Sequence, residues 1–176
     1  MKKSIDDPTR ATPLPVVGWR EWVSLPDLPV DLIKAKIDTG AHSSSLHAQD
    51  LEFFTRPVAG PEGVREREFV RFTTDPNHPG ARRTRKSRPG PEIVQPSVTT
   101  EAMVLDRRAV RSSSGDREVR PVILTRLRIG QFEFPIELNL TDRELMGFRF
   151  LIGRRAMHHR FWVDPSRSYL IGPQPP

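Results

Sequence analysis

The stretch Ile33-Lys34-Ala35-Lys36-Ile37-Asp38-Thr39-Gly40-Ala41 carries an acid, a hydroxyl and a glycine directly after a short strand-like run. The Asp38 carboxylate is suited to hold or polarise a water molecule, and the Thr39 hydroxyl is suited to fix a loop. Gly40 lets the backbone come close enough for its N–H to reach the carboxylate. A strand that ends in a plain Asp-Thr-Gly turn accounts for the same residues, because Asp and Gly are common in turns.

Short strand-like segments surround this turn. Apolar and polar residues alternate from Trp19 to Val23, which is typical of a strand with one buried face. Residues 98–110 and 118–128 predict a hairpin with its tip at 111–116, and residues 127–134 predict a second one with Gly130 at its turn. A further short strand is expected near residues 68–73. Several short strands with regular turns favour a small barrel or sandwich.

The late stretch Phe150-Leu151-Ile152-Gly153-Arg154-Arg155-Ala156-Met157 is the second informative part of the chain. An apolar strand runs into Gly-Arg there, and one or two helical turns are expected to follow. Another strand is expected after them.

The composition combines a modest hydrophobic content of 36% with 18 prolines and 11 glycines in 176 residues. One domain with a compact core and long exposed loops is the expected compromise. We expect a disordered segment at 1–14, the domain at 15–172 and a tail at 173–176. Within the domain, residues 74–97 form a Pro/Gly-rich loop with five positive charges at 82–88. We favour a solvated insertion over a binding arm, because no aromatic residue is interleaved among these charges.

The absence of cysteine excludes disulfides, thiolate catalysis and cysteine-bound zinc. No signal peptide is visible, and no stretch approaches the roughly 18 apolar residues of a membrane span. We therefore expect a soluble, cytoplasmic protein without membrane partners. The formal charge of +6, from 28 basic and 22 acidic residues, attracts polyanions in general and does not specify one.

An ordered set of motifs resembles the retropepsin-like aspartic peptidases. It is most similar to a bacterial family provisionally labelled ATP-dependent zinc proteases and associated with the ribosomal-protein glutamate ligase. The resemblance covers roughly residues 16–171, with 82–91 as an insertion, and a complete ordered set is far more specific than Asp-Thr-Gly alone. Its motifs are Gly18-Trp19-Arg20-Glu21-Trp22, Lys34 to Ala41, Ser45-Leu46-His47-Ala48, Arg111-Ser112-Ser113-Ser114-Gly115, Arg120-Pro121-Val122-Ile123, Leu140-Thr141-Asp142-Arg143, Met146 and Leu151-Ile152-Gly153-Arg154.

The resemblance implies an all-β fold, a closed acid-protease barrel with one short C-terminal helix, in which Asp38 is the catalytic acid. Peptidases of this type use two carboxylates that share a proton, so a homodimer would place Asp38 of each subunit against its mate. Thr39 would lock the two loops together, and Gly40 would donate its N–H to the carboxylate. The implied supporting or substrate-binding residues are Ala41, His42, His47, Ser112, Ser113, Gly115, Gly153 and Arg154. Gly153 would let the late strand pass close under the site, and the hairpin around 112–115 would close over the substrate.

His42 stands where viral retropepsins carry an acid that pairs with the arginine of the late Gly-Arg. Arg154 therefore needs another partner, for which Asp142 or Glu144 is available, and a viral-style dimer interface cannot be assumed. The zinc of the family label has little support, since only Asp38, His42 and His47 offer a candidate ligand set. A structural histidine is the simpler interpretation of His47. No phosphate-binding Gly-x-x-x-x-Gly-Lys-Ser/Thr loop supports ATP dependence, and we expect no cofactor.

Three functions remain open. The first is an aspartic-type endopeptidase acting as a homodimer on a peptide or protein, with an acidic or glutamate-rich substrate favoured by the positive charge. The second is a non-catalytic basic binding module on the same fold, which grips an acidic tail; nucleic acid is the less expected partner. The third is a zinc-dependent hydrolase that uses Asp38, His42 and His47.

Overall fold

Strands dominate the part of the chain that the computed structural model describes, which comprises residues 13–77, 95–111, 117–144 and 146–172. The only helix in this part, α1, spans Arg154–Met157. No helix of these residues is long and apolar enough to cross a membrane. The strands are β1 (Val16–Gly18), β2 (Arg20–Leu25), β3 (Val30–Asp38), β4 (Ser44–His47), β5 (Gln49–Gly60), β6 (Gly63–Thr74), β7 (Val98–Arg111), β8 (Arg117–Ile129), β9 (Phe132–Thr141), β10 (Phe150–Gly153) and β11 (Trp162–Asp164).

Six strands close into a barrel. They pair in the order β2, β3, β10, β4, β9, β8, and β2 meets β8 again through Ser24 and Arg128. Side chains alternate across each strand, so that β2 buries every second residue and the interior is filled by aliphatic side chains and Phe150. The predicted closed all-β barrel with one short helix near the C-terminus is confirmed.

The parallel pairing of β3 with β10 brings the early and late motifs together. Its register places Asp38 opposite Gly153. β10 also pairs with β4 in the antiparallel sense, so it lies between the two strands that flank the Asp-Thr-Gly loop. The N–H of Arg154, the first residue of α1, donates to the carbonyl group of Ala41 at 2.9 Å. The helix therefore begins directly against the loop.

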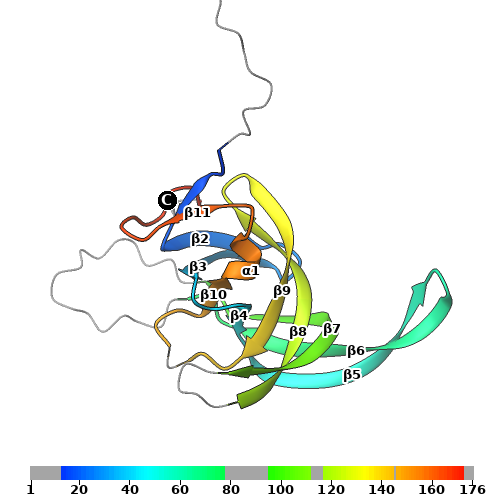
Figure 1. Ribbon diagram of the computed structural model, residues 1–176. Helices are drawn as coiled ribbons and strands as arrows, with labels where there is room; N and C mark the ends of the chain where they lie inside the picture. The colour runs from blue at the N-terminus through cyan, green and yellow to red at the C-terminus, as the bar shows by residue number, and fades with distance from the viewer. Residues whose placement is uncertain (1–12, 78–94, 112–116, 145, 173–176) are drawn as a thin grey trace, which may run out of the picture.

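A long hairpin of β5 and β6 extends away from the barrel (Figure 1). Together with β7 it enlarges the barrel sheet to nine strands. The strand predicted near residues 68–73 is part of the longer strand β6, and β5 was not predicted. Most side chains of β5 and of the outer half of β6 are exposed on both faces. The sequence consequently carries no apolar alternation from which a strand could be predicted there.

The two predicted hairpins are present as β7–β8 and β8–β9, with Gly130 at the second turn. The tip of the first, with Ser112, Ser113 and Gly115, lies outside the described residues. So do the charges at 82–88 and most of the 74–97 loop, residues 1–12 of the N-terminal segment, and the tail at 173–176. The two ends of that loop are held together, since the N–H of Gln95 donates to Asn77 Oδ1 at 2.8 Å.

A buried carboxylate ties the beginning of the described chain to its end. Glu21 of β2 has no exposed surface and accepts hydrogen bonds from three backbone N–H groups. These belong to Gly18 at 2.7 Å, Leu170 at 2.8 Å and Gly172 at 3.2 Å. β1 and β11 also pair with each other in parallel, so both terminal segments are anchored.

Candidate active site

Asp38 ends β3, and the turn that follows wraps around its carboxylate. The N–H groups of Gly40 and Ala41 donate to Asp38 Oδ1 at 3.0 and 3.1 Å. The predicted hydrogen bond from Gly40 is confirmed. On the other oxygen, the ammonium group of Lys36 lies 3.3 Å from Oδ2. Lys36 is two residues earlier in the same strand and therefore points to the same face of the sheet.

The pKa of the Asp38 carboxyl group is lowered below its ordinary value. Partial burial acts to raise it, but the N–H of Ala41, the Lys36 ammonium and the N–H of Gly40 together outweigh that effect. The isolated chain therefore holds Asp38 as a carboxylate, an acceptor oriented by three donors.

Gly153 passes directly beneath the Asp-Thr-Gly loop, as the sequence predicted. A Cβ atom at this position would lie 2.5 Å from the carbonyl oxygen of Ser43, a distance at which one of the two must move. The N–H of Gly153 donates to Ser44 Oγ at 3.2 Å. Only a residue without a side chain permits this close approach of the two segments.

Arg154 finds its partners in the backbone. Its guanidinium donates to the carbonyl oxygens of Gly40 at 3.1 Å and Thr39 at 3.4 Å. The expected pairing with Asp142 or Glu144 was wrong. The N–H of Glu144 donates to Asp142 Oδ1 instead, and Asp142 lies beside His47. Arg154 thus braces the Asp-Thr-Gly loop through backbone carbonyl groups, and no described acid pairs with it.

The two histidines near the loop have different surroundings. His42 is exposed at the rim, whereas His47 is buried in β4 and its Nδ1 accepts the N–H of Arg143 at 2.9 Å. No group of three His, Cys, Asp or Glu side chains in the described ranges is placed to hold a metal ion. The candidate zinc set of Asp38, His42 and His47 is therefore not assembled. The hydrogen bond to Nδ1 makes His47 a structural residue.

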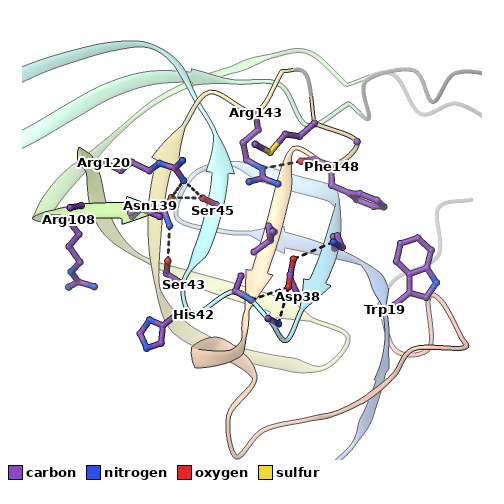
Figure 2. A pocket seen from close by; sticks show the side chains of 18 residues that line it. Trp19, Asp38, His42, Ser43, Ser45, Arg108, Arg120, Asn139, Arg143 and Phe148 are labelled. Atoms are coloured by element: carbon purple, nitrogen blue, oxygen red, sulfur yellow. Dashed lines mark hydrogen bonds and ion pairs between the residues drawn. The ribbon is translucent and has the colours of Figure 1, made fainter. Parts of the chain in front are cut away.

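A cavity of about 1000 Å³ opens over Asp38 (Figure 2). Gly40, Ala41 and His42 line it, so that this part of the predicted site comes together. The cavity lining does not include Thr39, His47, Gly153 or Arg154, although Gly153 and Arg154 contact the loop from outside. The β7–β8 hairpin forms one side through Arg108 to Val110 and Arg120, and the segment after β9 forms another.

A buried polar network forms the wall opposite Asp38. The Asn139 carboxamide accepts hydrogen bonds from Ser45 Oγ and, at 3.3 Å, from Arg120, and it donates to Ser43 Oγ at 3.2 Å. Arg120 in turn binds Glu118 at 2.8 Å. Figure 2 shows Arg120, Asn139, Ser45 and Ser43 directed toward one another along the wall. Such a network fixes the shape of the cavity, because each member holds its neighbour.

Sequence analysis did not place Lys36, Arg120, Asn139 or Arg143 in the site. Two of them carry a local signal that is visible in hindsight. Asn139 stands inside a largely apolar strand, and Lys36 is a cation two residues before Asp38. The side chains of Ser43 to Ser45 bond to residues about a hundred positions away, in β9 and β10.

The barrel, the Asp-Thr-Gly loop at the end of β3 and the late Gly-Arg beneath it define a protein of the retropepsin-like class. A family model named RimB-like, described as retropepsin-like aspartic endopeptidase RimB, matches residues 16–174. The chain belongs to this family, and the resemblance indicated by the sequence motifs is confirmed.

Curated relatives carry a different description. Proteins named probable alpha-L-glutamate ligase from Shewanella halifaxensis and Parasynechococcus marenigrum are 37% identical over 159 residues and 39% over 157 residues. These matches cover 90% and 89% of this chain but only 30% and 29% of the relatives. The chain thus spans less than a third of their length. Among solved structures, Lpg0085 of unknown function from Legionella pneumophila has the same fold, with a TM-score of 0.61, 24% identity, and coverage of 89% of this chain and 98% of that one.

Proposed function

We propose that the protein is a peptidase that hydrolyses peptide bonds by an aspartic mechanism, with Asp38 contributed by each of two subunits. The observation that carries this proposal is the Asp38 carboxylate itself. Two backbone N–H groups hold it at the floor of a cavity of about 1000 Å³, large enough for several residues of a peptide. The geometry fixes one oxygen and leaves the cavity side for a water molecule.

A second subunit would supply the second carboxylate. Thr39 and Gly40 are exposed at the tip of the loop, and no described residue hydrogen-bonds to the Thr39 hydroxyl. A two-fold axis through this tip would bring two loops together and let each hydroxyl bond to its mate. Two adjacent carboxyl groups cannot both ionise easily, so that the pair holds one proton, although Asp38 of a single chain is ionised.

The paired site divides the chemistry between its two carboxyl groups. The ionised one takes a proton from water, whose oxygen attacks the peptide carbonyl carbon, while the protonated one donates its proton to the carbonyl oxygen. The tetrahedral species then collapses: the second carboxylate takes back a proton from one hydroxyl group as the carbonyl re-forms, the C–N bond breaks, and the amine leaves with a proton from the first carboxyl group. The β7–β8 hairpin, whose strands border the cavity, would cover a bound peptide.

An acidic or glutamate-rich peptide is the substrate that the surroundings favour. Among the described residues that line the cavity, four are cations, namely Lys36, Arg108, Arg120 and Arg143, and one, Asp38, is an acid. Relatives that contain a segment like this chain are named for glutamate ligation. A domain that handles glutamate-containing chains fits both observations.

The test combines an isosteric variant with dilution. Asp38→Asn should lose cleavage of a glutamate-rich peptide by at least about a thousandfold, as expected for removal of a group that is both acid and base. Wild-type specific activity should fall as the protein is diluted, in step with loss of the dimeric mass. An Asn variant as active as wild type would refute the mechanism. Activity that is independent of concentration, from a monomer, would refute the two-subunit site.

A basic binding module is the second candidate, because the described residues that line the cavity offer four cations and one carboxylate per chain. It predicts that Asp38→Asn binds an acidic peptide as tightly as the wild type does, with an affinity that falls as salt rises. Wild-type protein that shows no cleavage of any acidic peptide, yet binds one in this way, would select this function over the first.

A further inference from the structure

The cations around the cavity differ in whether a carboxylate of the protein already forms an ion pair with them. Most of them already have a carboxylate within ion-pair distance, and these pairs leave little unbalanced charge. The pairs are Lys36 with Asp38, Arg108 with Asp106 and Glu137, and Arg120 with Glu118.

Arg143 is the exception among the described residues. It is only 8% exposed, and no described carboxylate forms an ion pair with it. Its Nε donates to the carbonyl oxygen of Phe148 at 3.2 Å. This bond uses one of the five N–H donors of the guanidinium and does not neutralise its charge. Burial and the nearby charge of Arg120 lower its pKa, and the charge of Asp38 acts in the opposite direction.

A buried cation without a counter-charge is costly, and an arginine does not escape the cost by losing its proton. Structures usually retain such a group where a ligand supplies the missing charge. Arg143 is also held rigidly, because its own N–H donates to His47 Nδ1 at 2.9 Å while its side chain bonds to Phe148. Figure 2 shows its guanidinium directed into the space that Asp38 faces.

We propose that Arg143 is the receptor for a carboxylate group of the peptide, held beside the bond over Asp38. This inference rests on the proposed function and assigns its acidic preference to one residue. The guanidinium fork matches the two oxygens of a carboxylate and can donate to both at once. Arg120, Ser45 and Asn139 form the adjoining wall, and there Arg120 already pairs with Glu118.

Two sources of the carboxylate have the same chemistry. One is a Glu or Asp side chain next to the bond that is cleaved, which makes the enzyme selective within a chain. The other is the α-carboxylate at the end of a peptide, which makes it trim from the C-terminus. Four peptides distinguish the two sources. They carry either Glu or Gln side chains, and each sequence is made with a free and with an amidated C-terminus.

The experiment measures binding as well as cleavage, so that it does not depend on turnover. Calorimetry would use Asp38→Asn protein and Asp38→Asn/Arg143→Met protein with each of the four peptides, and kcat/KM would be compared for wild type and Arg143→Met. Met preserves much of the side-chain volume, and replacing an unpaired buried cation by an apolar group is compatible with folding. Arg126→Met, which removes an arginine that is paired with Asp27 and Glu133 and does not line the cavity, is the matched control.

Loss of Arg143 should weaken binding and lower kcat/KM roughly 10- to 100-fold for the peptides that carry the recognised carboxylate, and leave their neutral counterparts unchanged. Arg143→Lys should recover only part of the loss, because an ammonium group lacks the fork. Dependence on the side chain or on the free end identifies the source. Equal weakening for all four peptides, or an undiminished preference in Arg143→Met, would overturn the assignment. Arg143-dependent binding without any cleavage would uphold it while refuting the peptidase.

Discussion

The ammonium group of Lys36 lies 3.3 Å from the carboxylate of Asp38, on the same face of one strand. The strand itself holds this cation beside Asp38, because residues two apart on a strand share a face. Any acid–base chemistry of Asp38 takes place beside that charge.

The pH dependence of activity tests the influence of Lys36. A nearby cation favours the ionised carboxyl group and contributes to the lowered pKa of Asp38. Replacing it in Lys36→Met should raise both apparent pKa values of a proton-sharing pair and move the pH profile of kcat/KM to higher pH. Lys36→Arg keeps the charge and should keep the wild-type profile. If the Met variant changes only the height of the profile, Lys36 has no electrostatic role.

The contact beneath the loop predicts the effect of Gly153→Ala. The added Cβ would lie 2.5 Å from the carbonyl oxygen of Ser43, and the loop must shift to admit it. We expect a loss of about 1–3 kcal/mol in the free energy of unfolding and a larger proportional loss of activity, since the shift moves the Asp38 loop. Gly147→Ala is the control, because a Cβ there meets no atom within 4 Å. Equal behaviour of the two variants in urea unfolding would contradict the expectation.

The buried carboxylate of Glu21 predicts a stability effect far from the cavity. The fully buried Glu21 carboxylate accepts hydrogen bonds from three backbone N–H groups. Glu21→Gln weakens charge-assisted hydrogen bonds and turns one acceptor into a donor, so it should cost about 1.5–3 kcal/mol of unfolding free energy. Glu52→Gln breaks only an exposed pair with Arg71 and should change stability by less than about 1 kcal/mol. A Glu21→Gln protein as stable as the wild type would show that these bonds contribute little.

The surroundings of His47 predict a pH-dependent stability. Burial, aided by the charge of Arg149, lowers its pKa below the ordinary value of 6.5, although Asp142 and two further acids act in the opposite direction. The unfolded chain then binds the proton more readily than the folded one. The stability contributed by neutral His47 is therefore present above pH 6.5 and is lost as the pH falls below that value.

Urea midpoints at about pH 7.5 and about pH 5.5 measure this loss. His47→Gln retains an acceptor for the N–H of Arg143 but cannot gain a charge, so its midpoint should fall less than that of the wild type. His42→Gln, on the exposed rim, controls for the removal of a histidine as such. Identical pH slopes for wild type and His47→Gln would remove His47 from the acid sensitivity.

The sequence allowed the barrel and the centre of the site to be predicted because both rest on local patterns. The alternation in β2 and β9 and the turn at Asp38 are each visible within about ten residues. The β5–β6 arm was missed because charged residues occupy both of its faces. The partners of Arg154 and of the serine run could not be predicted either, since they lie about a hundred residues away and depend on strand order. A pattern shows which face a residue occupies, but topology determines what lies opposite.

The parallel pairing of β3 with β10 also has a consequence in time. Asp38 leaves the ribosome early, whereas Gly153, which completes its support, is among the last residues of the domain to be made. Until β10 inserts between β3 and β4, the Asp-Thr-Gly loop lacks the support of Gly153 and the barrel cannot close. A growing or truncated chain would therefore lack a working site. The order of synthesis would thus delay the proposed chemistry until the barrel has closed.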